Sequence, residues 1–228
     1  MEMVDERADR LWVPWTTADV ARGVLLVVAV ALAVLAIAWQ TGLRPGAFTL
    51  LLVPLQIAMV ASVFIFGVGR YRVPWSSAGF RTTATRFIFL QPWGVLFLSI
   101  VLTGLYGAAV TYAGWDSLIP APLPDDALGE GLLKALSILV LTLLGPFSEE
   151  TFFRGFALAG LVHRMGPLGA AIGTSLIFAA GHGSLGALVP TFVSSMLLCW
   201  LYLKSRSIWP CVAAHSAQNV IAVGVLVG

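Results

Sequence analysis

Residues 23–43 read GVLLVVAVALAVLAIAWQTGL, a run without a single charged side chain. A helix needs about 20 mostly apolar residues to cross roughly 30 Å of hydrocarbon, because each residue advances the helix by about 1.5 Å. This run is therefore long enough for one complete crossing. A segment of mixed charge precedes it, so we interpret it as an uncleaved first helix rather than as a secretory signal peptide.

Further apolar stretches of suitable length follow along the chain. They cover residues 45–69, 87–115, 131–162, 165–203 and 208–228. The stretch 165–203 is too long for one helix, and glycines near residue 183 together with Pro190 indicate a break within it. The pattern predicts an all-α, polytopic transmembrane bundle of about seven helices, within a range of six to eight.

Composition supports the bilayer as the solvent of this chain. Of the 228 residues, 59% are hydrophobic and only 11% are charged, against about 25% charged in an average soluble domain. We expect one integral membrane domain over residues 1–228. The formal net charge of +2 is spread along the chain, so nucleic acid is not an expected partner.

Basic residues are concentrated in alternate loops between the predicted spans. They are Arg70, Arg72, Arg81 and Arg86 after the second span, Arg164 after the fourth, and Lys204 with Arg206 after the sixth. The other loops carry Arg44 alone or the acidic segment 116–130. Because Lys and Arg accumulate in cytoplasmic loops, this distribution predicts a cytoplasmic N-terminus. The compact chain is typical of a prokaryotic plasma membrane protein.

Glu149 and Glu150 are adjacent acidic residues inside the fourth apolar stretch. A charge near the bilayer centre costs at least about 2.5–3.5 kcal/mol on insertion scales, so such residues are functional candidates. Arg154 follows Glu150 by four residues and should pair with it on one helix face, whereas Glu149 is turned by about 100°. Glu149 is therefore the carboxylate for which the sequence predicts a reactive role.

His182, His215 and Asn219 are polar residues in other apolar stretches. A hairpin centred near Gly166 places Glu150 and His182 at equal depth, roughly 24 Å from the turn. His215 and Asn219 lie on one helix face because they are four residues apart. We expect these groups to converge on one buried polar site.

Two hydrolytic chemistries fit this set of side chains. Glu149 and His182 can share a water molecule as base and orienting group, while His215 and Asn219 supply donors to a developing oxyanion. Alternatively, Glu149, His182 and His215 are three ligands of the type that hold catalytic Zn²⁺. The sequence does not separate these two mechanisms, and it contains neither an HExxH nor a GxGD motif.

Three short motifs carry a resemblance to a known family. They are EETFFR at 149–154, FAAGH at 178–182 and HSAQN at 215–219. The chain resembles the CPBP family of intramembrane proteases, also called the CAAX protease and bacteriocin-processing or Abi family. Its eukaryotic relatives are the type II CAAX prenyl endopeptidases. The resemblance covers residues 130–225, which would form the catalytic core.

The resemblance implies an intramembrane endopeptidase that cleaves membrane-associated or lipid-modified peptides and proteins. It implies that Glu149 and His182 activate water, that His215 and Asn219 form the oxyanion site, and that Glu150 with Arg154 supports the motif. Members of the family have been described both as metalloproteases and as glutamate-dependent proteases, so the choice between zinc and no metal stays open.

A different class of function uses the same residues. An immunity or scaffold protein, or a proton-coupled transporter, would use the buried Glu and His cluster as a proton relay without cleaving a substrate. A transporter usually shows an inverted repeat with paired broken helices, and we find no such repeat. The protease is therefore the favoured interpretation.

Overall fold

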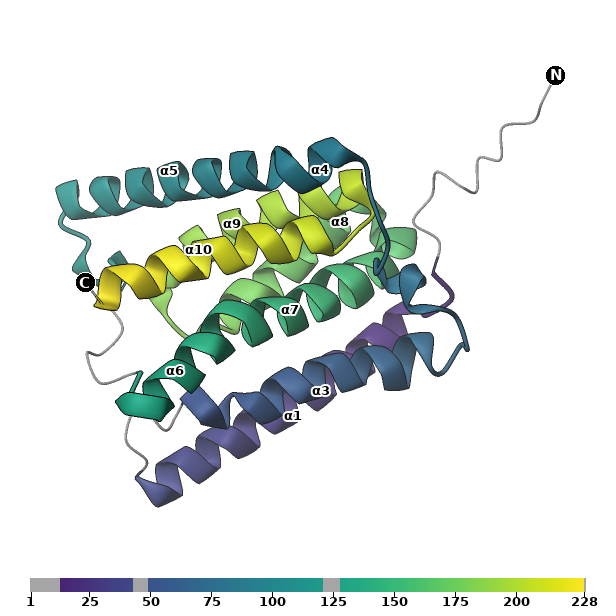
Figure 1. Cartoon of the computed structure of the whole chain (residues 1–228), viewed down its shortest axis with the longest axis horizontal. Helices are drawn as coiled ribbons and strands as arrows, with labels where there is room; N and C mark the ends of the chain where they lie inside the picture. The colour runs from purple at the N-terminus through teal and green to yellow at the C-terminus, as the bar shows by residue number, and fades with distance from the viewer. Residues whose placement is uncertain (1–12, 43–48, 121–127, 228) are drawn as a thin grey trace.

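The computed structural model describes residues 13–42, 49–120 and 128–227, and Figure 1 shows their arrangement. Within these ranges every regular element is a helix of the α, π or 3-10 type, and none is a strand. The prediction of an all-α fold is confirmed for the described residues.

The first half of the chain forms long helices joined by short connections. They are α1 (Thr17–Thr41), α3 (Val53–Val63) with the π-helix η1 (Phe64–Val68), the 3-10 helix η2 (Trp75–Ala78), α4 (Thr85–Phe89), α5 (Gln91–Tyr112) and the 3-10 helix η3 (Asp116–Leu118). The apolar stretches of the sequence thus fold as helices.

The second half contains one long helical run followed by two more helices. The elements are α6 (Gly131–Leu139), the π-helix η4 (Val140–Leu144), α7 (Gly145–Glu150), the π-helix η5 (Thr151–Leu158), α8 (Ala159–Ala180), α9 (Leu185–Ser205) and α10 (Trp209–Val227).

Among the described residues, five helical runs are long and apolar enough to cross a membrane. They are Thr17–Thr41, Thr49–Val68, Thr85–Tyr112, Gly131–Ala180 and Leu185–Ser205. The run Gly131–Ala180 has 50 residues and is interrupted at Gly166, whose φ of 70° and ψ of 168° are not helical. The chain turns there, where the sequence predicts a hairpin, and α8 packs back against η5. These runs support a transmembrane bundle, while the count of about seven crossings and the cytoplasmic N-terminus stay predictions.

The η5 helix lies at the centre of the bundle. All eight of its residues, Thr151–Leu158, are buried. Glycines allow neighbouring helices to approach it: a methyl group built on Gly23 would lie 2.8 Å from Cε1 of Phe156, and one on Gly67 would lie 3.1 Å from its Cδ2. Side chains in α1 and α5 that face away from this centre are exposed, as expected for surfaces that contact lipid.

Two of the basic connections meet at one end of the bundle. Nε of Arg81 donates a hydrogen bond of 2.6 Å to the carbonyl oxygen of Arg206, and Oγ of Ser207 donates one of 2.7 Å to the carbonyl oxygen of Arg81. Oγ1 of Thr83 donates to the carbonyl oxygen of Ser205 at 2.9 Å. The loops that precede α4 and α10 therefore lie on the same side, as their shared positive charge predicts.

The buried carboxylate of Asp19 lies in the first turn of α1, at this same end of the bundle. Oδ1 of Asp19 contacts Nη1 of Arg22 at 3.0 Å and Nε of Arg70 at 3.6 Å. Its Oδ2 accepts hydrogen bonds from the hydroxyls of Tyr71, at 2.7 Å, and Thr16, at 2.8 Å. The hydrogen bond to Asp19 raises the pKa of Tyr71 above its ordinary value. This cluster ties the N-terminus of α1 to the chain that follows η1.

Candidate active site

The two glutamates lie on a short α-helical turn between two π-helical segments. Because π-helical hydrogen bonds join residue i to residue i+5, the backbone N–H of Gly145 donates to the carbonyl oxygen of Val140. In the same register the carbonyl of Leu141 would pair with residue 146, but Pro146 has no N–H to donate. The sequence predicts that Pro146 bends or loosens the helix, and the π-helix η4 is the form that this loosening takes.

Asn219 binds the carbonyl that Pro146 leaves without a helical partner. Its Nδ2 donates a hydrogen bond of 2.8 Å to the carbonyl oxygen of Leu141. This contact joins α10 to η4 at the level of the glutamates. The amide nitrogen carries two hydrogens, so one of them is engaged with Leu141.

Glu150 and Arg154 form the ion pair that their spacing predicts. Nη1 of Arg154 lies 2.9 Å from Oε1 of Glu150, and both side chains are fully buried. Nη2 of Arg154 donates to Oγ and the carbonyl oxygen of Ser195 in α9, at 2.9 and 3.2 Å. The guanidinium also lies 5.0 Å from the ring centroid of Phe178. Arg154 thus connects η5 to two neighbouring helices.

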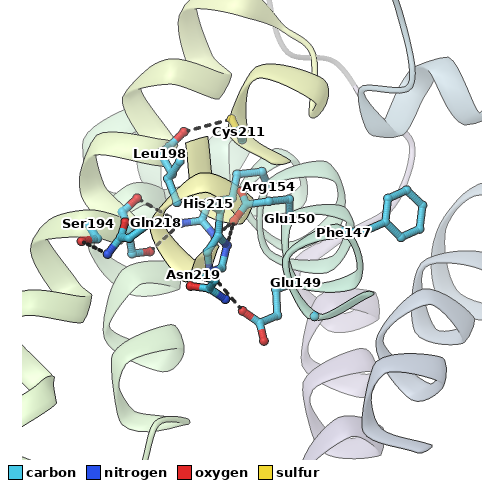
Figure 2. A network of polar contacts seen from close by, with 12 residues as sticks. Phe147, Glu149, Glu150, Arg154, Ser194, Leu198, Cys211, His215, Gln218 and Asn219 are labelled. Carbon is cyan, nitrogen blue, oxygen red and sulfur yellow. Dashed lines mark hydrogen bonds and ion pairs between the residues drawn. The ribbon is translucent and has the colours of Figure 1, made fainter. Parts of the chain in front are cut away.

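His215 lies between the two glutamates, as Figure 2 shows. Its Nδ1 lies 2.8 Å from Oε1 of Glu150, and its Nε2 lies 3.7 Å from Oε2 of Glu149. An ionised carboxylate only accepts hydrogen bonds, so Nδ1 carries a hydrogen and Nε2 is directed towards Glu149. The Glu149 side chain is 20% exposed whereas that of Glu150 is not exposed at all, so Glu149 is the accessible carboxylate.

His182 is exposed rather than buried, which differs from the prediction. The helix ends at Ala180, and Gly183 adopts a φ of 65° just after the histidine, so the ring lies beyond the packed part of α8. Its Nδ1 lies 2.9 Å from the carbonyl oxygen of Phe178. No direct contact with Glu149 or Glu150 occurs among the described residues.

The ring of Phe178 connects the two histidines. Its centroid lies 4.9 Å from that of His182 and 5.9 Å from that of His215. The sequence predicts a packing role for Phe178, and its 4% exposure agrees. Of the residues predicted to converge, Glu149 and Glu150 both lie beside His215. His182 reaches this group only through the ring of Phe178, among the described residues.

The predicted zinc ligands are not assembled as a ligand set. Within residues 13–42, 49–120 and 128–227, no group of three His, Cys, Asp or Glu side chains is arranged to hold a metal ion. Nδ1 of His215 is engaged with Glu150, and His182 is turned to the carbonyl of Phe178. Glu149, His182 and His215 as placed do not fit a zinc site, so we derive no catalytic step through a metal.

Gln56 and Ser148 are polar residues near the glutamates that the sequence analysis did not identify. The buried side chain of Gln56, on α3, accepts a hydrogen bond at Oε1 from the hydroxyl of Ser148. The signal in the sequence was a carboxamide in the middle of the uncharged run 45–69. The side chain connects α3 to the turn that carries Glu149.

Comparison with known families matches the second half of the chain. Residues 131–221 match the sequence model of the family described as type II CAAX prenyl endopeptidase, Rce1-like. The matched segment contains all three motifs and runs from α6 into α10, and the predicted family resemblance is confirmed over it. Comparisons with curated proteins and with solved structures found no match.

Proposed function

From the match of residues 131–221 to the type II CAAX prenyl endopeptidase family, we propose that the protein is an intramembrane endopeptidase. It hydrolyses peptide bonds of membrane-associated or lipid-modified peptides and proteins. One observation carries the proposal: Glu149 is a partly exposed carboxylate next to Glu150, which is itself buried and paired with Arg154. One carboxylate is thus held in place while the other is free to react.

Glu149 acts as the general base in the proposed reaction. It accepts a proton from a water molecule, whose oxygen forms a bond to the carbonyl carbon of the scissile peptide. The carbonyl electrons move to the oxygen and form a tetrahedral oxyanion. The carbon–nitrogen bond then breaks as Glu149 returns the proton to the leaving nitrogen.

His215 and Asn219 stabilise the oxyanion in this proposal. Protonated His215 donates from Nδ1 to Glu150 and has Nε2–H available beside Glu149. In that state the two glutamates, Arg154 and His215 sum to zero net charge, which favours a cluster in a medium of low dielectric constant. Asn219 has a second amide hydrogen besides the one that binds Leu141.

His182 orients the attacking water. A carbonyl oxygen only accepts hydrogen bonds, so the contact with Phe178 places the ring hydrogen on Nδ1. Nε2 is then an acceptor and can hold the second hydrogen of the water. Because the ring is exposed and touches Phe178, it can reach the water on the accessible side of the site.

Purified protein in detergent or liposomes, incubated with a library of membrane-embedded peptides, tests the proposal. Glu149→Gln should lower the rate by about 10²–10⁴-fold, the usual contribution of a general base, and His182→Ala and His215→Ala should also lower it. Glu130→Gln is the matched control, because Glu130 precedes α6 as an exposed carboxylate outside the site. Cleavage by Glu149→Gln at the wild-type rate, or no cleavage by any folded form, would disprove the proposal.

Adding a chelator in the same assay distinguishes glutamate-dependent hydrolysis without a metal from zinc-dependent hydrolysis. Glutamate-dependent hydrolysis survives thorough removal of zinc. Loss of activity on chelation, with recovery on adding Zn²⁺, would instead assign the protein to the metalloproteases.

A further inference from the structure

The side-chain amide nitrogen of Gln56 donates no hydrogen bond to another described residue. Gln56 is only 5% exposed. Its Oε1 accepts a hydrogen bond from the hydroxyl of Ser148. The residue as a whole is nearly buried, but Nε2 is not one of the fully enclosed polar atoms that lack a partner, so a small molecule such as water can reach it and accept its hydrogen bond.

Gly145 lies beside both Gln56 and Glu149. A methyl group built on Gly145 would lie 3.9 Å from Nε2 of Gln56 and 3.9 Å from Oε1 of Glu149. The same point lies 3.1 Å from the carbonyl oxygen of Val140. One donor and two acceptors therefore surround a position where no side chain is present.

The two oxygens of Glu149 face different groups. Oε2 is directed to His215 at 3.7 Å, whereas Oε1 lies 3.9 Å from a methyl group built on Gly145, the same distance as Nε2 of Gln56. A water beside Oε1 would thus have a carboxylate to take its proton and an amide N–H to hold its oxygen. Bound waters need two to four such polar partners.

We propose that Gln56 is a further catalytic residue, whose amide donates to the oxygen of the attacking water while Oε1 of Glu149 accepts its proton. This inference rests on the proposed peptidase function. Breaking the O–H bond transfers the proton to Glu149, and the oxygen held by Gln56 forms the new bond to the carbonyl carbon. The site then includes α3, which lies outside the matched residues 131–221.

Replacement of Gln56 by a side chain of similar length without a donor tests this role. Gln56→Met should lower kcat by about 10²-fold, the order expected when a reacting group loses its position, with little change in KM. Ser62→Ala is the matched control on α3, because Ser62 is buried and hydrogen-bonded to the carbonyl oxygens of Ala58 and Gly23, away from the glutamates. It should keep wild-type kcat.

Two further variants separate catalysis from a purely structural role. Ser148→Ala removes the hydrogen bond to Oε1 of Gln56 but keeps the amide donor, so it should retain more activity than Gln56→Met. In Gln56→Glu the new carboxyl donates only while it is protonated, so its activity relative to wild type should rise as the pH falls. The ratio is compared only at pH values where circular dichroism shows equal folded fractions, because ionisation of the new carboxyl beside Glu149 would also destabilise the fold.

The outcomes distinguish this inference from the proposed function. Wild-type kcat in Gln56→Met, or equal losses in Gln56→Met and Ser148→Ala, would overturn the role of Gln56 while leaving the peptidase intact. If Gln56→Met does not fold, the pH dependence of Gln56→Glu decides, and a flat activity ratio overturns the role. Absence of cleavage by wild type overturns the peptidase itself.

Discussion

Asp19 near the start of α1 and the Glu149–Glu150 pair in α7 are both acidic groups held within apolar helices, but they differ in the donors around them. Asp19 has arginines on Oδ1 and hydroxyls on Oδ2. In the pair, Oε2 of Glu150 is buried without a hydrogen-bond partner among the described residues. Within the described part of the chain, the one ionisable partner of Glu149 is His215, at 3.7 Å.

A buried carboxylate can serve stability or reactivity, depending on how many of its oxygens have donors. A carboxylate with donors on both oxygens is stabilised as an anion and has no free position for a substrate or water. The Asp19 cluster therefore stabilises the fold by holding the start of α1 against the chain that follows η1. The glutamate pair keeps accepting positions free, as the proposed base requires, and Arg154 supplies a positive charge that offsets the burial of Glu150.

Removal of Arg154 should break the glutamate site most severely. In Arg154→Ala the buried Glu150 loses its counter-charge, and breaking a buried pair in this way costs about 3–5 kcal/mol. We expect a large fall in the folded yield and melting temperature of the purified protein. His215→Ala, the control, keeps the Glu150–Arg154 pair and should lose much less; equal losses would show that the pair does not stabilise the fold.

Asn219→Ala should have the next largest effect on stability. It leaves the partly buried carbonyl of Leu141 without its partner, which costs on the order of 1 kcal/mol, the lower end of the range for a buried acceptor. Adding Pro146→Ala supplies an N–H at the position that π-helical geometry pairs with Leu141. The double variant should therefore recover part of the lost melting temperature. Strictly additive effects of the two changes would contradict this pairing.

Gly145→Ala places a methyl group beside Glu149, 3.9 Å from its Oε1 and 3.1 Å from the carbonyl oxygen of Val140. The added methyl group occupies the point between Gln56 and Glu149, so we expect at least a tenfold loss of kcat, equivalent to about 1.4 kcal/mol. The melting temperature should change less than in Arg154→Ala. Gly94→Ala on α5 is the control, since a methyl group there meets nothing within 4 Å; equal kcat losses would exclude a local cause.

Tyr71→Phe should have the smallest effect, at the closed cluster. Tyr71 has its pKa raised in the folded state by the hydrogen bond to Asp19, so the protonated phenol stabilises the fold. This stabilisation is complete below pH 10 and is lost as the pH rises through the higher folded-state pKa. The difference in melting temperature between wild type and Tyr71→Phe should therefore shrink above pH 10. A constant difference would argue against the hydrogen bond.

The sequence predicted the features that depend on local spacing. Uncharged runs gave the helices, the i+4 spacing gave the pair of Glu150 and Arg154, and Gly166 marked the turn of the long helical run. Each of these needs only the geometry of one helix or one turn. The same reasoning selected Glu149 as the reactive carboxylate, and its catalytic role stays a proposal.

The features that the sequence did not predict depend on how helices rotate against one another. In a soluble protein the apolar face marks the inside, but in a bilayer both lipid-facing and protein-facing residues are apolar. Hydrophobicity alone therefore did not show that Gln56 turns towards Ser148 or that Phe178 lies between two histidines. The π-helical segments η4 and η5 make the orientation of side chains harder to predict, because a π-helical turn changes which residues share a helix face.

The carbonyl of Leu141, which Pro146 leaves without a helical partner, fixes the position of α10 through Asn219. Asn219 and His215 lie on one face of α10 and reach Leu141 and Glu150 on the opposing helix. A slip of α10 by a single residue would rotate that face by about 100° and break both contacts together. The helix therefore has one register in which both contacts form, and we expect the candidate site to assemble cooperatively rather than gradually.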